Sequence, residues 1–522
     1  MTVRGWILLA TVLASGIVFL DSTVVNVALP RIGRELPSSM FGVLEAQSYV
    51  YTSYLLTLSA LLVLAGALTD HYGRKRMFAI GLAGFGVTSA LCGLAPNIEL
   101  LVLFRLAQGA AGALLIPGSL ALIRSAFEGE AQGRAFGIWA GASAATTIAG
   151  PIVGGILVDT ISWRAAFLIN LPLVAVALAL TLIHVRESRD DAVTGGFDWP
   201  GALVAAVAVG GLSLGAIYGQ QRDWRDPLAF AALGLGALAA VSFVPLMARR
   251  RRPLVPLGLF RSRNFTVTNL STLLIYGALY VSSSYLPLFQ QGTLGYTAAA
   301  AGLAGVPGSI LLTLLSTRFG ALAGRHGPRR YMAAGPALMG AGMLWFARAP
   351  AASQAWLFVP DDPASYLPSA GYVADFLPGQ ILFGLGLAVM VAPLTTALMA
   401  SVPARYAGVG SAVNNAISRV GPQLAGAVIF IAITSSFYAG MAQRLPGTDT
   451  SAPAFRATFA PLNPPALPGT PSPELLRQAA LAREQSTQSF HLAMLVSAGL
   501  LFAGAAVNLA GIRREPAGGE PA

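Results

Sequence analysis

Long apolar stretches recur along this chain, and they constrain its fold more than any other feature. Most of them exceed the roughly 18 residues that a helix needs to cross a bilayer. Strands of a membrane barrel would alternate apolar and polar residues, and these stretches do not. Since 55% of the residues are hydrophobic and only 11% are charged, a soluble fold would lack polar surface. The sequence therefore predicts an all-α polytopic membrane protein.

Fourteen stretches qualify as membrane spans, with boundaries good to a few residues. The first contains Asp21 and is too long for the apolar region of a signal peptide, so we interpret it as a span. The predicted spans are residues 6–29, 43–68, 77–95, 98–123, 135–158, 164–185, 198–218, 227–247, 265–290, 298–323, 331–347, 373–399, 409–434 and 489–511.

Basic residues set the expected orientation. Most of the 33 Lys and Arg residues fall in segments on the same side as the N-terminus, which the positive-inside rule places in the cytoplasm. Both termini are therefore predicted to be cytoplasmic. The segment 436–488, rich in Pro, Ala, Ser and Thr, is predicted to be external and partly irregular, with one short helix beginning near Ser472. This topology also explains the net charge of +11 without nucleic-acid binding.

A short basic turn occurs twice. The first turn reads GALTDHYGRKR from Gly66 to Arg76, and the second reads GALAGRHGPRR from Gly320 to Arg330. The repeat predicts two halves that pivot about a central site. We expect a six-helix half at 1–190, an inserted two-helix hairpin at 191–250, and a second six-helix half at 251–522.

Four motifs in order carry a family resemblance. The first turn resembles the signature loop of the major facilitator superfamily. The stretches LDSTVVNVALP from Leu20, RLAQGAAGA from Arg105 and GPIVGG from Gly150 resemble the first-, fourth- and fifth-helix motifs of its fourteen-helix drug:proton antiporter branch. WRAAFLINLP from Trp163 also fits that branch. The resemblance implies a monomeric exporter of small hydrophobic compounds or drugs in the bacterial cytoplasmic membrane, coupled to protons and working by alternating access.

The chain departs from the family pattern at several places. Thr146 stands where the fifth-helix motif usually has Gly, and His71 replaces the usual Arg. The second turn has Gly324 where the first has Asp70. Asn414 and Asn415 occupy a region where cation-exporting members often have acids, which argues against a preference for cationic drugs.

The turns contain candidate gating residues. A glycine permits close packing or a tight turn, and Asp70 can accept hydrogen bonds from Arg74 or from a helix N-terminus across the two halves. The alternative is that the basic residues only fix the topology. The candidates are Gly66, Asp70, Gly73, Arg74, Lys75 and Arg76, with Gly320, Arg325, Gly327, Arg329 and Arg330 in the second turn.

Asp21 is the acid that falls deepest within a span, and a buried carboxylate is costly and usually functional. Helical rise places Asp21 about 13 Å and Arg105 about 12 Å from the same surface. We expect the two to form a proton-titratable pair; the alternative is a static ion pair that holds two helices together.

Other polar and glycine positions are candidates with two possible roles. Asn26, Gln108, Asn414 and Asn415 either line the cavity or join helices, and Arg419 meets an anionic substrate group or backbone carbonyls. Gly150, Pro151, Gly154 and Gly155 serve close packing or a gate. No nucleotide loop, catalytic constellation, metal site or cofactor is expected. The rival functions are export or facilitation of a specific metabolite or anion, and a non-transporting sensor or scaffold.

Overall fold

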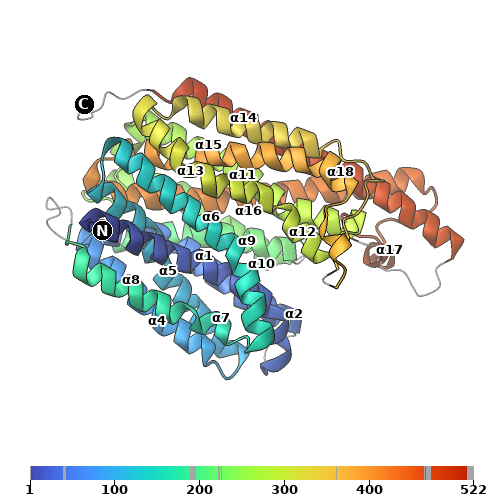
Figure 1. Ribbon diagram of the computed structural model, residues 1–522, viewed down its shortest axis with the longest axis horizontal. Helices are drawn as coiled ribbons and strands as arrows, with labels where there is room; N and C mark the ends of the chain where they lie inside the picture. Colours follow the sequence, from blue (N-terminus) through green and yellow to red (C-terminus); the bar gives the residue numbers. More distant parts are fainter. Residues whose placement is uncertain are drawn as a thin grey trace.

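Helices account for the regular secondary structure of the computed structural model, which describes residues 2–38, 43–188, 196–221, 224, 226–359, 361–463, 465 and 472–513. They lie side by side along the long axis of the molecule (Figure 1). No strand occurs in these residues. The all-helical class predicted from the apolar stretches is therefore confirmed.

The first half begins with a long helix that carries Asp21 and ends with the helix that precedes residue 188. Its elements are α1 (Val3–Glu35), α2 (Val43–Ala60), α3 (Leu62–Tyr72), α4 (Arg74–Gly93), α5 (Ile98–Ala126), α6 (Gly129–Thr160), α7 (Ala165–Leu168) and α8 (Asn170–His184). A hairpin of α9 (Trp199–Gln221) and α10 (Pro227–Arg249) follows.

The part of the chain that follows the hairpin is also helical, with two π-helical segments at helix junctions. Its elements are η1 (Leu257–Arg261), α11 (Arg263–Leu288), η2 (Phe289–Leu294), α12 (Ala298–Ala304), α13 (Val306–His326), α14 (Arg329–Phe346), η3 (Pro363–Tyr366), η4 (Tyr372–Phe376), α15 (Leu377–Ala400), η5 (Ala404–Tyr406), α16 (Ala407–Arg444), α17 (Pro453–Thr458) and α18 (Pro473–Gly511).

The described residues contain 11 helices that are long and apolar enough to cross a membrane, or 12 if the bent pair α2 and α3 forms one span. That pair bends by 47° at Leu61. Helices α6 and α14 occupy the predicted spans 135–158 and 331–347 but are not among these. Helix α14 has only 18 residues and begins with Arg329 and Arg330. The predicted number of fourteen spans is thus not confirmed.

Helix α5 also touches α16, and α6 also touches α15, but the two most extensive contacts between the halves are α3 against α16 and α6 against α13. We call these two contacts the seam. Helix α9 touches α2 and α3 of the first half and α16 of the second, so the hairpin contacts both halves. One apolar cluster contains Phe78 and Phe136 of the first half and continues into the second half through Met399 and Val409. A separate cluster, with Phe289, lies within the second half.

The beginning of α1 and the end of α18 lie at the same end of the bundle, at the left of Figure 1. Trp6 on α1 stacks on His184 on α8, with ring centroids 5.0 Å apart. Arg329, in the second turn, donates to the carbonyl of Leu509 near the end of α18 at 2.8 Å. We call this end of the bundle the turn end and the other the far end, where α17 lies.

The far end corrects one prediction about the segment 436–488. Helix α16 continues to Arg444, and the helix that begins after Ser472 is not short but runs without a break to Gly511. The start is as predicted: Ser472 caps the helix by accepting from the Leu475 N–H at 3.2 Å. The helix continues because residues 474–498 contain neither Pro nor Gly to end it.

Candidate functional site

Asp21 and Arg105 form a fully buried ion pair between α1 and α5. Arg105 Nη1 donates to Asp21 Oδ2 at 2.5 Å, and both side chains are 0% exposed. Arg105 Nε also donates to the Val50 carbonyl at 3.2 Å, and the guanidinium lies 4.1 Å from the centroid of the Tyr54 ring. Burial of two charges is tolerated only with such additional partners. The structure thus brings together the two residues whose depths agreed in the sequence.

Two amides complete the surroundings of the carboxylate. Gln108 Nε2 and Asn170 Nδ2 each donate to Asp21 Oδ1 at 3.1 Å. The same two nitrogens lie 3.2 and 3.0 Å from Ser89 Oγ. The network therefore joins α1, α4, α5 and α8 around one carboxylate.

Asn170 and Ser89 were not identified from the sequence. Asn170 lies in WRAAFLINLP, a stretch that fits the family, but its own side chain is uncharged, and Ser89 is one small polar residue in an apolar span. Two buried atoms of the cluster, Arg105 Nη2 and Asn170 Oδ1, have no hydrogen-bond partner. Buried polar atoms usually have a partner, so these two leave hydrogen-bonding capacity of the cluster unused. Asn26, a candidate either for the cavity or for joining helices, is exposed on α1 and does not join the cluster.

The first turn contacts the opposite half through Asp70. Its carboxylate accepts from the Gly408 N–H at 3.0 Å and the Val409 N–H at 2.8 Å, in the first turn of α16. Arg74 lies 3.4 Å from the same carboxylate and donates to the Ala404 carbonyl. A carboxylate at a helix N-terminus interacts favourably with unpaired N–H groups and the helix dipole. Asp70 therefore links the halves at the turn end of the seam.

Glycines let the first turn take this position. A Cβ on Gly66 would lie 2.4 Å from the Gly408 carbonyl oxygen. Gly73 has φ +107°, where its Cβ would also meet Glu187 at 2.7 Å. Glu187 in turn accepts from the N–H groups of Lys75 and Arg76, each at 3.0 Å. Neither glycine can be replaced without moving its neighbours.

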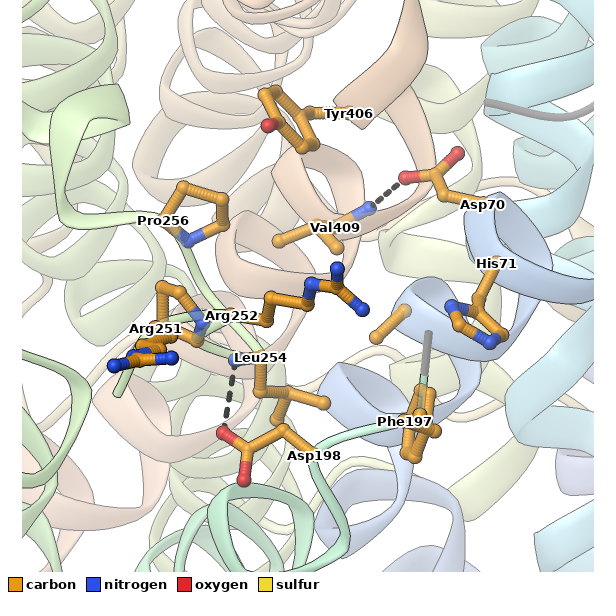
Figure 2. A pocket seen from close by; sticks show the side chains of 13 residues that line it. Asp70, His71, Phe197, Asp198, Arg251, Arg252, Leu254, Pro256, Tyr406 and Val409 are labelled. Carbon is orange, nitrogen blue, oxygen red and sulfur yellow. Dashed lines mark hydrogen bonds between the residues drawn. The ribbon is translucent and has the colours of Figure 1, made fainter. Parts of the chain in front are cut away.

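A cavity of about 260 Å³ lies beside this contact. Figure 2 shows Asp70 and Asp198 on different sides of it, with Arg252 extending into the space between them. Asp198 accepts from the Leu254 N–H at 3.1 Å, and the ring of Phe197 lies 5.5 Å from that of His71. The entrance to the hairpin is thereby attached to the first turn.

The second turn also contacts the first half, but here the acid belongs to the helix that the turn packs against and not to the turn itself. Gly320 faces Gly133, so that a Cβ would lie 2.3 Å from the Gly133 carbonyl oxygen. Gly324, in the position of Asp70, packs against Glu130 of α6, and Glu130 pairs with Arg325 at 2.6 Å. Of the remaining candidates there, Gly327 has φ +84°, Arg329 bonds α18 and Arg330 is exposed.

Two glycines of the fifth-helix motif pack α6 against α1. The residues of α1 that they contact follow Asp21 by two and three positions. A Cβ on Gly150 would lie 1.8 Å from Thr23 Oγ1, and one on Gly154 would lie 3.0 Å from the Val24 Cα. Gly155 has open space around it. Pro151 lies in the same helix, with its side chain outside the described part.

The candidates of α16 separate into two groups. Asn414 donates to Asn269 at 3.1 Å and to Thr272 at 2.8 Å, both on α11, and Asn415 donates to its own helix at Ser411. Asn414 therefore joins α16 to α11, whereas Asn415 bonds within α16. Arg419 takes part in none of the ion pairs of the described residues.

The titratable groups near Arg419 are the phenols of Tyr51 and Tyr54 on α2, in the other half. A cation at this depth is expensive. Arg419 also lies where α16 of the second half faces α2 of the first half.

Comparison with known proteins decides the family. The model of the Major Facilitator Superfamily matches residues 11–426. This chain belongs to the major facilitator superfamily. Its members are membrane transporters, so the family predicted from the four motifs is confirmed.

Three curated relatives from bacteria resemble the chain over most of its length. The chain is 34% identical over 423 residues to the multidrug resistance protein Stp of Mycobacterium tuberculosis, covering 81% of this chain and 74% of the relative. It is 33% identical to the puromycin resistance protein pur8 of Streptomyces alboniger, covering 86% and 85%. It is 30% identical to the tetracenomycin C resistance and export protein of Streptomyces glaucescens, covering 83% and 76%.

Solved structures share the superfamily fold. The proton:xylose symporter XylE superposes with a TM-score of 0.54 at 15% identity, covering 94% of both chains. The human organic anion transporter MFSD10 gives a TM-score of 0.55 at 14% identity, covering 96% of this chain and 98% of the other. At these identities the likeness concerns the fold alone.

Proposed function

We propose that this protein exports small hydrophobic compounds, including drugs, across a bacterial cytoplasmic membrane in exchange for protons. The observation that carries the proposal is the Asp21 cluster: a carboxylate, fully buried, with one arginine and two amides around it. A carboxylate in such a place binds or releases a proton when its partners move. The relatives are named for multidrug resistance, puromycin resistance and tetracenomycin C export, which supports drugs as cargo.

We also propose the fourteen-span topology, with the turn end in the cytoplasm. Helices α6 and α14 complete the two six-helix halves, because both pack along neighbouring helices of the bundle. Arginine-rich segments gather at the turn end, as the positive-inside rule requires of a cytoplasmic side. The three units then correspond to residues 1–190, 191–250 and 251–522, and the far-end segment 436–488 is external.

Alternating access follows from the contacts at the seam. Asp70 on α3 and Arg325 on α13 make polar contacts across it at the turn end. Breaking these contacts opens the cytoplasmic side, and making them closes it. The first and second turns thus act as two latches of the same gate.

The test of the proposal is export and proton movement measured together. In a pump-deficient host, expression of the chain should raise resistance to a panel of uncharged hydrophobic drugs. In everted vesicles, substrate should cause proton release, and Asp21→Asn should abolish that release while the protein remains inserted. Glu35→Gln, on the same helix and paired with Arg31 at 2.6 Å, is the matched control and should behave as wild type.

A static role for the ion pair predicts a different result. Asp21→Asn would then leave Arg105 buried without its partner and destabilise the protein first. The double variant Asp21→Asn with Arg105→Gln would restore both protein level and transport. A double variant that exports as well as wild type therefore refutes proton coupling through Asp21.

Arg419 favours a second candidate, export of an anionic metabolite. It is a cation between the halves whose neighbours are phenols rather than carboxylates. An anionic group could neutralise it there. If Arg419→Gln abolishes export of acids but not of uncharged drugs, the anion is the physiological cargo.

A further inference from the structure

A second cavity lies within the C-terminal half, away from the Asp21 cluster. It has a volume of about 290 Å³, near the lower end of the range for ligand sites, and lies between α11 with η2, α12 with α13, and α15. Thr313 of α13 packs against Gly141 of α6 at the seam, and Ser309, which lines the cavity, is one helical turn before Thr313. The cavity therefore adjoins the seam.

The cavity lies toward the far end of the bundle. Ser309 precedes the end of α13 at His326 by 17 residues, which is about 26 Å at helical rise. Its walls include Leu286, Pro287 and Phe383. None of the residues that line it is charged.

One polar group in this wall lacks a partner. Gln290 lies in the π-helical segment η2, its side chain is only 1% exposed, and its Nε2 has no hydrogen-bond partner. A buried amide donor without an acceptor costs free energy, and π-helical turns are frequent at functional sites. Gln380, on α15, supplies a second amide to the lining.

Small residues create the space that Gln290 faces. A Cβ on Gly384 would lie 2.2 Å from the Gly308 Cα, and one on Gly308 would lie 3.2 Å from the Gln380 carbonyl oxygen. Helices α13 and α15 are thus in backbone contact beside the cavity. This side of the cavity is formed by main chain, so a change of side-chain rotamer there cannot close it.

We propose that this cavity is a binding subsite for uncharged, mainly apolar compounds that carry a hydrogen-bond acceptor such as a carbonyl oxygen. Gln290 donates its unpartnered N–H to that oxygen, and the apolar wall covers the rest of the ring system. A cation is disfavoured because the lining offers no carboxylate to compensate its desolvation. This inference names a substrate class for the proposed exporter. Its physiological meaning rests on the proposed export function, whereas the binding itself does not.

The test uses two uncharged probes of the same shape, benzophenone and diphenylmethane, which differ by one carbonyl group. Full-length protein in lipid nanodiscs is irradiated with benzophenone, and the labelled peptides are mapped. Labelling should fall within 286–312 or 380–387. In competition, unlabelled benzophenone should bind about tenfold more tightly than diphenylmethane, since one hydrogen bond to an otherwise unpaired buried donor distinguishes them.

Two variants of adjacent residues make the comparison specific. Gln290→Met should bind both probes equally, at the affinity of diphenylmethane. It should also unfold at the same or a higher temperature without ligand, because it removes an unsatisfied polar group. Gln291→Met, the same change at an exposed neighbour outside the cavity, should behave as wild type.

The outcomes separate the subsite from the exporter. Absence of labelling in these segments, or a tenfold preference that survives Gln290→Met, overturns the subsite. A lower unfolding temperature for Gln290→Met also overturns it, since the amide would then be structural. If the preference is lost as expected but no drug is exported by the wild type, the subsite stands and the proposed export function fails.

Discussion

Replacement of Asp70 by Asn should open the turn end of the seam. The carboxylate accepts two N–H bonds from α16, at 3.0 and 2.8 Å, and faces Arg74 at 3.4 Å. Hydrogen bonds to a charged group contribute about 1.5–3 kcal/mol each, and a neutral amide oxygen can keep one ordinary bond of about 1 kcal/mol. The closed form should therefore lose at least about 2 kcal/mol, which shifts the equilibrium toward the open form by at least roughly 30-fold.

A single introduced cysteine reports this shift. Val409 is 3% exposed, lines the cavity beside Asp70 and donates through its backbone, so Val409→Cys keeps the hydrogen bond. The native Cys92 is buried and gives little background. In inside-out membranes, Asp70→Asn should raise the rate of maleimide labelling at position 409 by a factor of the same order and reduce transport.

The control is another aspartate at a helix N-terminus. Asp226 accepts from the Leu228 N–H at 2.9 Å, but it caps α10 within the hairpin and does not cross the seam. Asp226→Asn should leave both labelling and transport unchanged. If Asp70→Asn also changes neither, the first turn is only a topological anchor and the latch does not exist.

Three further predictions concern the seam, the topology and the helix contacts of α16. Gly133→Ala should impair transport and raise the accessibility of the inner side, because its Cβ would lie 2.3 Å from the Gly320 backbone. Gly155→Ala, with open space around the added Cβ, is the control and should have no effect. Crosslinking between α6 and α13 measures how closely the two helices pack in each variant. Cysteine at Ser451 should react with an impermeant maleimide in intact cells and cysteine at position 262 should not, and the reverse pattern would invert the topology. Asn414→Leu should lower the unfolding temperature by removing two buried hydrogen bonds to α11, at a cost of about 1–3 kcal/mol, with export retained in proportion to folded protein.

The fold was predictable because its main determinants are local. Apolar length and the repeated turn indicate the helical class and the two related halves, and the four motifs indicate the superfamily. The broken span at Leu61 was not predictable, since no Pro or Gly occurs from residue 52 to residue 65. The continuous α18 was missed because a polar helix that extends beyond the membrane resembles a separate loop helix in sequence.

The site was predictable only where a charge marked it. Asp21 and Arg105 could be paired from their depths, but Asn170 and Ser89 are uncharged and become neighbours only when α4 and α8 pack against α5. Asn26, a candidate either for the cavity or for joining helices, is exposed and lies outside the Asp21 cluster, because five residues after Asp21 correspond to well over one turn of 3.6 residues. Glu130, the acid of the second latch, lies far from the second turn in sequence and was found only through the packing of α6 on α13.

Helix α9 limits how the molecule can move. It packs on α2, α3 and α16 at once, and a body in contact with two others cannot follow both when they rotate relative to each other. If the halves rock as proposed, one face of α9 must slide in every cycle. The face on α2 holds a close approach, because a Cβ on Gly210 would lie 3.1 Å from the Ala60 Cβ, and Phe197 adds the ring contact with His71. The hairpin then travels with the first half, and friction between α9 and α16 becomes a determinant of turnover that does not depend on the substrate.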